Sequence, residues 1–109
     1  MQWVNRTLPP QYPRVAHWPN SFVSGEVIFL IVKHLAGLEP VPPVPASAFS
    51  PDQSGLANVD GLFAMMDIVI DAGIDSAGVS LNDIRAGDAH AITQLLQGVR
   101  GWAAQRGFP

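Results

Sequence analysis

The chain has 109 residues, no cysteine and a formal net charge of -3, and only 14% of its residues are charged. This length suits one domain with a real hydrophobic core, and the absence of cysteine excludes disulfides, thiolate catalysis and the usual structural zinc sites. The acidic balance excludes the basic surface that nucleic-acid binding requires, so we expect a single domain over residues 1–109, in the cytoplasm, with no nucleic-acid partner.

The N-terminal segment is predicted to be the end of a helix followed by a proline-rich loop. Residues 1–6 include the apolar Trp3 and Val4, and the prolines that follow cannot continue a helix. Residues 9–20 carry four prolines with aromatic and aliphatic residues between them, which indicates a loop anchored on the core. We expect Trp3 to be buried and Trp18, within the loop, to be partly exposed.

A largely buried helix is expected after Ser21 or Ser24, either of which can cap its start. Apolar residues recur at helical spacing, and Gly37 ends the pattern. They are Val23, Val27, Ile28, Leu30, Ile31 and Leu35. The longest apolar run, Val27 to Val32, is far shorter than the roughly 20 residues that cross a bilayer, so no membrane span is predicted.

A proline-rich crossover over residues 39–45 follows this helix. Its four prolines exclude a helix or a central strand and favour a polyproline II conformation on the surface. Two PxxP spacings in it are suited to an aromatic-lined groove of a partner, but no Lys or Arg flanks them. We therefore favour a stiff connection over a ligand motif.

The next helix is capped by Asn58 and ends at Gly73. Its apolar residues are assigned to one face that packs into the core, with Asp60, Asp67 and Asp71 on the flanks. The assigned residues are Val59, Leu62, Phe63, Met66, Val69 and Ile70.

A short helix near residues 80–86 and a long helix over residues 89–104 complete the chain. Ser80 and Asp88 are the expected N-caps, and Gly87, like Gly73, can adopt the left-handed conformation that ends a helix. The last helix places one apolar stripe toward the core and Gln94, Gln97 and Arg100 toward water. The stripe consists of Ile92, Leu95, Leu96, Val99 and Trp102. The predicted fold class is all-α.

No catalytic, cofactor-binding or metal-binding residues are predicted, and an enzymatic role is not expected. His17, His34 and His90 fall in a loop, near a helix end and in a first helical turn, and form no close ligand pair. Asp67 and Asp71 lie four residues apart and could hold a cation or act as an acid–base pair, but a solvated acidic face is favoured. The serines Ser21, Ser24 and Ser80 sit where helices start, so capping is their expected role.

Taken in order, four groups of residues resemble a calponin homology domain. They are Trp3-Val4-Asn5 with Leu8; Phe22-Val23-Ser24-Gly25 leading into residues 27–35; Gly73-Ile74; and Leu81-Asn82-Asp83-Ile84 with Gly87-Asp88. The likeness covers nearly the whole chain. It implies a bundle of about four main helices plus short connecting helices, with a truncated first helix, in a longer protein.

The resemblance also implies a non-enzymatic protein-interaction module of cytoskeletal, actin-related or Rho-type signalling context. Its partner would be a protein, such as actin filaments or a cytoskeletal regulator, in the cytoplasm at the cytoskeleton. Because actin and microtubule surfaces are acidic like this chain, we expect a single adaptor-like domain that binds filaments weakly or through a partner.

Three alternatives remain open. The domain could be a microtubule-binding variant of the same family, or a purely structural or dimerisation domain; its oligomeric state is not predicted. The most distant alternative is a small all-α metal-dependent enzyme or binder that uses Asp60, Asp67 and Asp71 with a histidine.

Overall fold

The computed structural model describes residues 2–7, 22–38, 44–51, 53, 55, 58–75 and 78–107. These residues form the helices α1 (Gln2–Thr7), α2 (Glu26–Ala36), α3 (Val59–Asp71), α4 (Leu81–Arg85) and α5 (Ala89–Gln105), with a 3₁₀ helix η2 (Ala46–Phe49) before α3. No strand occurs among them, which confirms the all-α prediction. None of these helices is long and apolar enough to span a bilayer.

Several predictions fall on residues outside the described ranges. These are the proline-rich loop of residues 9–20 with Trp18 and His17, the N-cap candidate Ser21, and most of the crossover, residues 39–43. η2, which follows the crossover, was not predicted, because four residues in a 3₁₀ helix show no hydrophobic periodicity.

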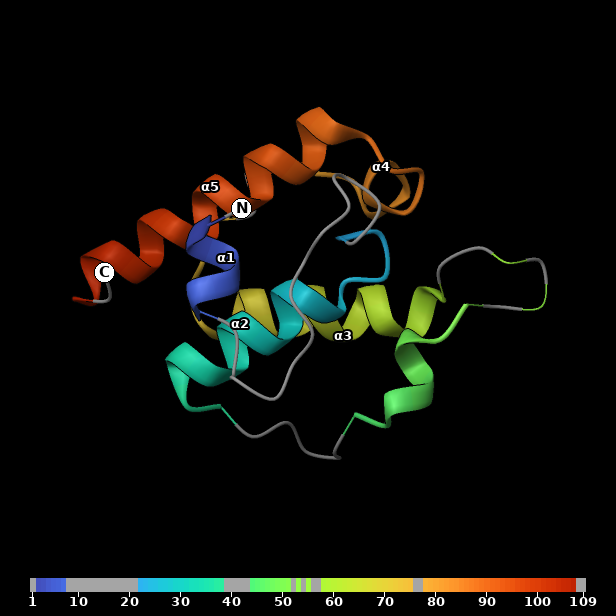
Figure 1. Ribbon diagram of the computed structural model, residues 1–109, viewed down its shortest axis with the longest axis horizontal. Helices are drawn as coiled ribbons and strands as arrows, with labels where there is room; N and C mark the ends of the chain where they lie inside the picture. The colour runs from blue at the N-terminus through green and yellow to red at the C-terminus, as the bar shows by residue number, and fades with distance from the viewer. Residues whose placement is uncertain are drawn as a thin grey trace.

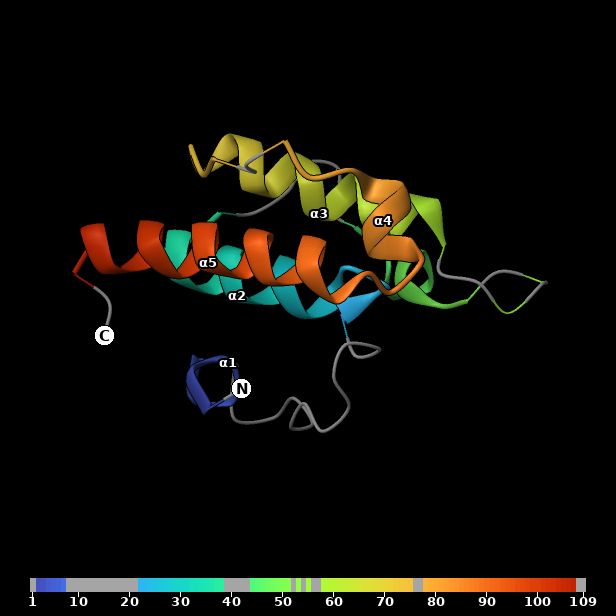
Figure 2. The same cartoon turned by 90° about the horizontal axis from the view of Figure 1, so that it is seen from above.

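The helices are arranged around α2 and α5, which lie together in the middle of the molecule (Figures 1 and 2). α3 and α4 lie on one side of this pair and α1 lies on the other side. The sequence of α2 suits this position, since five of its residues are buried and they span a broad arc of about 200° around the helix. They are Val27, Ile28, Phe29, Ile31 and Val32.

The short helix α1 is held to the bundle by its two apolar residues. Trp3 is 7% exposed and Val4 is 5% exposed, and both belong to the main hydrophobic core. The Arg100 guanidinium of α5 lies 5.9 Å from the centroid of the Trp3 ring, within the range of a cation–π contact. Trp102, in the apolar stripe of α5, is also buried, so the burial predicted for both tryptophans is confirmed.

Side-chain caps start α3, α4 and α5 at the predicted residues. The Asn58 Oδ1 atom accepts a hydrogen bond from the backbone N–H of Asp60 (3.0 Å), and the Ser80 Oγ atom accepts one from Asn82 (3.2 Å). Asp88 Oδ1 accepts two, including one from His90 (2.9 Å). α2 begins differently: Gly25, with a φ of 81°, precedes the helix, and Ser24 Oγ accepts from Glu26 N–H (3.3 Å).

The ends of α3 and α4 have the same hydrogen-bond pattern. Gly73 and Gly87 have φ values of 79° and 81°, in the left-handed region that glycine adopts without strain. After α3, Ile74 N–H donates to the Val69 carbonyl, five residues back, and Gly73 N–H donates to the carbonyl three residues back. This is the Schellman motif, and its recurrence after α4 confirms both predicted helix ends.

Two helical glycines lie where backbones approach closely. A Cβ atom at Gly61 in α3 would lie 2.5 Å from the Ala48 carbonyl oxygen of η2 and 3.1 Å from the Ser24 carbonyl oxygen. A Cβ atom at Gly98 in α5 would lie 2.7 Å from the Asp75 carbonyl oxygen. The absence of side chains at these positions lets α3 lie against η2 and lets α5 lie against the turn that follows α3.

The packing of α3 corrects one sequence-based prediction. The helix buries Leu62, Met65, Ile68 and Val69, together with Gly61. Val59, Phe63 and Ile70 were assigned to the core, but they are exposed, and Met66 is only half-buried. The apolar residues of α3 extend over a wide arc around the helix, and the elements packed against α3 cover only part of that arc. Part of the predicted core face therefore lies at the surface.

Gly98→Ala and Gly101→Ala form a matched pair of substitutions in α5. Nothing lies within 4 Å of a Cβ atom at Gly101, so Ala there should stabilise the fold by about 0.5–1 kcal/mol through its helix propensity. At Gly98 the Asp75 carbonyl must move, and we expect a loss of roughly 1–3 kcal/mol. Urea denaturation of both variants measures the difference; equal stabilities would show that α5 does not approach the turn this closely.

Truncation of the α5 stripe tests the core. Leu95 is fully buried and Trp102 is 9% exposed, so replacing either with Ala should lower the free energy of unfolding by about 3–5 kcal/mol. Gln97→Ala, on the exposed side of the same helix, should change it by less than about 0.5 kcal/mol. A loss below about 1 kcal/mol for Leu95→Ala in urea denaturation would place that stripe at the surface.

Candidate functional site

The outward side of α3 carries a continuous row of apolar residues, here called the outer stripe: Val59, Phe63, Met66 and Ile70. Val59 is 43% exposed, Phe63 is 57% exposed and Ile70 is 62% exposed. Their successive spacings of four, three and four residues place all members of the stripe within about 60° of one another around the helix axis. The outer stripe is therefore one surface feature and not a set of scattered apolar side chains.

The position of α3 in the fold explains why this row is uncovered. α3 lies at one side of the bundle, with α2 and α5 to one side of it (Figure 2). Its buried residues Leu62, Met65 and Val69 occupy the side that faces the core. The outer stripe lies roughly 100° around the helix from these residues, where α4 borders it only at its N-terminal end and its side chains remain exposed.

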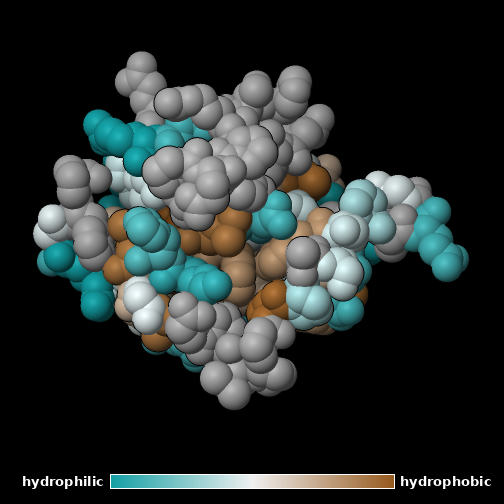
Figure 3. Space-filling model, turned by 60° about the horizontal axis from the view of Figure 1, so that its bottom comes forward, coloured by the Kyte–Doolittle hydropathy of each residue, from teal (hydrophilic) through white to brown (hydrophobic). Residues whose placement is uncertain are grey.

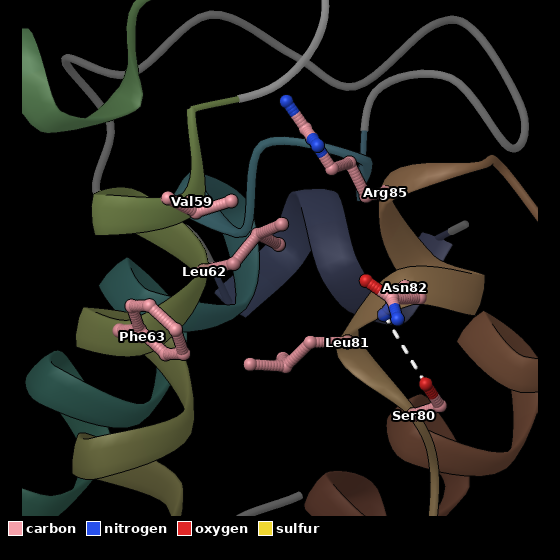
Figure 4. Close-up of a pocket in the computed structure, with 7 residues that line it drawn as sticks. All are labelled: Val59, Leu62, Phe63, Ser80, Leu81, Asn82 and Arg85. Carbon is pink, nitrogen blue, oxygen red and sulfur yellow. Dashed lines mark hydrogen bonds between the residues drawn. The ribbon is translucent and has the colours of Figure 1, made fainter.

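A groove borders the outer stripe at its N-terminal end, where α3 faces α4. The groove has a volume of about 340 Å³ and is open to solvent. Its apolar wall comes from α3 and from Leu81, and polar groups of α4 lie at its other edge (Figure 4). The lining residues are Val59, Leu62, Phe63, Ser80, Leu81, Asn82 and Arg85.

The side chains in this groove are arranged for apolar contact. Leu62 of α3 and Leu81 of α4 project into the space between the two helices, and Phe63 lies at the edge of that space (Figure 4). The hydroxyl of Ser80 is already engaged in capping α4 through the Asn82 N–H. The groove thus extends the apolar surface of the outer stripe toward α4.

One edge of the outer stripe is acidic. Asp60, Asp67 and Asp71 are exposed, and at about 100° per residue they fall within about 40° of one another on the same side of the stripe. α3 contains no Lys, Arg or His. The exposed position of Asp67 and Asp71 confirms the solvated acidic face that the sequence predicts.

Among the residues considered for chemistry, those that the structure describes form no common site. His34 and His90 are exposed, on α2 and at the start of α5. Among the residues that the structure describes, no group of three or more His, Cys, Asp or Glu side chains is placed to hold a metal ion. Asp60, Asp67 and Asp71 therefore do not form a metal site with either described histidine. The outer stripe and its groove provide an apolar contact surface with acidic side chains along one edge.

Hydrophobic side chains also reach the surface on the face that lies at the bottom of Figure 1. Figure 3 shows them near the centre of that face, between hydrophilic residues. The described surface is thus a mixture of apolar and polar areas, and the outer stripe differs from it in being a row along one helix with a groove at its end.

Comparisons of the chain with known protein families, with curated proteins and with solved structures gave no match.

The sequence pattern does not reveal the outer stripe, because the apolar residues of α3 follow one another around the helix as if they formed a single face. Two overlapping rows are present, one with Leu62, Met65 and Val69 and one with Val59, Phe63 and Ile70. One signal distinguishes them: Gly61 lies on the side of Met65 and Ile68, and a glycine inside a helix often marks a close approach of backbones. Its position points to the row that is buried.

Serine substitutions at two phenylalanines test the exposure of the outer stripe. Phe63→Ser should change the free energy of unfolding by less than about 1 kcal/mol, because this side chain is already largely in water. Phe22→Ser should lower it by more than about 3 kcal/mol, because Phe22 is fully buried. The measurement is chemical denaturation followed by tryptophan fluorescence. Equal losses in the two variants would mean that Phe63 is part of the core.

Proposed function

We propose that this chain is a non-enzymatic protein-interaction module of cytoskeletal, actin-related or Rho-type signalling context. The observation that carries the proposal is the outer stripe: three large hydrophobic side chains exposed in a row beside an apolar groove. Leaving such a row in water is unfavourable, and contiguous exposed apolar patches mark interaction sites in many proteins.

The cytoskeletal context rests on the resemblance to calponin homology domains. The motif residues fall at comparable points of the helical order: Trp3-Val4-Asn5 in α1, Gly73-Ile74 directly after α3, and Ser80 to Asp88 across α4 and the start of α5. This agreement supports a calponin-homology-like bundle with a short first helix. It also supports a cytoplasmic, cytoskeleton-associated domain that acts as an adaptor within a longer protein.

The negative charge of the chain affects how strongly it would bind filaments. With a net charge of -3 and an acidic edge on α3, direct binding to the acidic surface of actin is opposed by repulsion. We therefore propose weak filament binding or binding through a partner protein, and a microtubule-binding variant meets the same repulsion.

The exposed outer stripe also favours one alternative function, a dimerisation domain. Two copies that bury their stripes against one another would remove the same apolar surface from water. Sedimentation velocity over a range of protein concentrations distinguishes the two functions, because only dimerisation makes the sedimentation coefficient depend on concentration.

Co-sedimentation of the purified domain with actin filaments and with microtubules tests the filament part of the proposal. We expect no sedimenting fraction at about 50 mM salt, where repulsion between the acidic surfaces is strongest, and at most a small, non-saturating fraction at about 150 mM, where salt screens that repulsion. Saturable sedimentation at the higher salt would contradict the adaptor version and indicate direct filament binding.

A capture experiment tests the interaction function itself. The immobilised domain should retain proteins from cytoplasmic extract, and Phe63→Ser should retain fewer of them because it interrupts the outer stripe. A domain that is monomeric, retains no protein and does not sediment with filaments would contradict the proposed function.

A further inference from the structure

We infer that the outer stripe and its groove bind a basic amphipathic helix of a partner protein. This inference rests on the proposed function and names the chemistry of the partner. Three observations support it: the α3 surface has a shape that fits a helix, the charges beside that surface attract a basic partner, and the same charges disfavour other ligands.

The shape of the surface fits a helix. The outer stripe runs from Val59 to Ile70, about 16 Å or three helical turns. Together with α4 it forms a ridge and an adjoining groove, into which the side chains of a packed helix can insert. A partner helix with apolar residues at positions i, i+4, i+7 and i+11 presents a row of the same length and spacing.

The charges beside the stripe select the polar residues of that helix. Asp60, Asp67 and Asp71 form one edge of the stripe over nearly its whole length, and α3 supplies no positive charge to balance them. Lys or Arg residues on the flank of the partner that faces this edge would lie against these carboxylates, while the flank that faces α4 would meet Arg85, which lines the groove. Pairing of this kind adds specificity and speeds association, and it disfavours partner helices with acidic flanks.

The same charges disfavour the competing occupants. In a symmetric dimer whose α3 helices run antiparallel across the outer stripe, the acidic edges of both copies would lie on the same side of the interface, where like charges repel. Membrane surfaces rich in anionic lipid and nucleic acids are polyanions, so they are repelled as well. The groove is polar only along its α4 edge, which carries Asn82 and Arg85, because its lining from α3 is apolar and the Ser80 hydroxyl is engaged in a cap.

The test uses two designed peptides of about 18 residues with fluorescent labels. Both are helix-forming and carry Leu at i, i+4, i+7 and i+11; the flanking positions are Lys in one peptide and Glu in the other. Fluorescence anisotropy at about 50 mM salt measures their affinities for the whole chain. We expect the Lys peptide to bind at least about tenfold more tightly than the Glu peptide.

Two double variants locate the binding. Phe63→Ser with Ile70→Ser should weaken the Lys peptide by about tenfold or more, since both side chains are exposed and contribute little to the core. Asp67→Asn with Asp71→Asn should remove most of the preference for Lys over Glu. The matched control, Gln94→Lys with Gln97→Lys, changes the net charge by the same amount on the exposed side of α5 and should keep the preference.

The opposing outcomes separate this inference from the proposed function. Equal binding of both peptides, or binding that persists in the Phe63→Ser, Ile70→Ser variant, would overturn the inference. Concentration-dependent dimerisation that this variant abolishes would overturn it in favour of a second copy. If neither peptide binds while the domain still retains extract proteins, the inference fails and the interaction function stands. If the domain also retains no extract protein and does not sediment with filaments, both the inference and the proposed function are contradicted.

Discussion

The close approach of α3 to η2 and to the start of α2 at Gly61 is the contact on which the surface of this protein depends. A Cβ atom at this position would lie 2.5 Å from the Ala48 carbonyl oxygen and 2.8 Å from the Phe49 ring. The absence of a side chain fixes the rotation of α3 about its own axis, with Leu62 and Met65 directed into the core. Once that rotation is set, Phe63 lies at the open edge of the groove beside α4, and both Phe63 and Ile70 remain exposed. The candidate binding surface is thus a consequence of how the core is built.

The two long helices beside α2 illustrate the difference between a covered and an uncovered apolar row. α5 carries one stripe, which is buried except for the half-buried Leu96, and its outward residues are polar and exposed. These are Gln94, Gln97 and Arg100. α3 buries a stripe of the same kind and exposes a second one. Since both helices are stabilised by their inner stripes, the second row on α3 is not needed to hold the bundle together, and the proposed interaction function would account for it.

The charges beside the outer stripe determine which kind of partner helix it prefers. Apolar contact alone discriminates poorly between partner helices, because any row of Leu or Phe at helical spacing buries a similar area. The carboxylates of Asp60, Asp67 and Asp71 lie along the row and add a charge requirement. The net negative charge of the whole chain acts in the same sense at longer range, so a basic segment is attracted before contact and acidic surfaces are repelled. The resemblance to calponin homology domains supplies the cellular context of the proposal, and α3 supplies its site.

The sequence by itself determined the features that depend on neighbouring residues. The caps at Asn58, Ser80 and Asp88 and the left-handed glycines that end α3 and α4 involve groups within a few residues of one another, so composition and order suffice to locate them. The stripe of α5 was also predictable, because polar residues bound it on both sides. η2 left no periodic signal, and the prediction for Trp18 concerns a residue outside the described ranges. Only the tertiary structure decided which row of α3 is buried. Hydrophobic periodicity shows that a helix has apolar faces, but when two such faces overlap, the contact at Gly61 selects the inner one and leaves the other exposed.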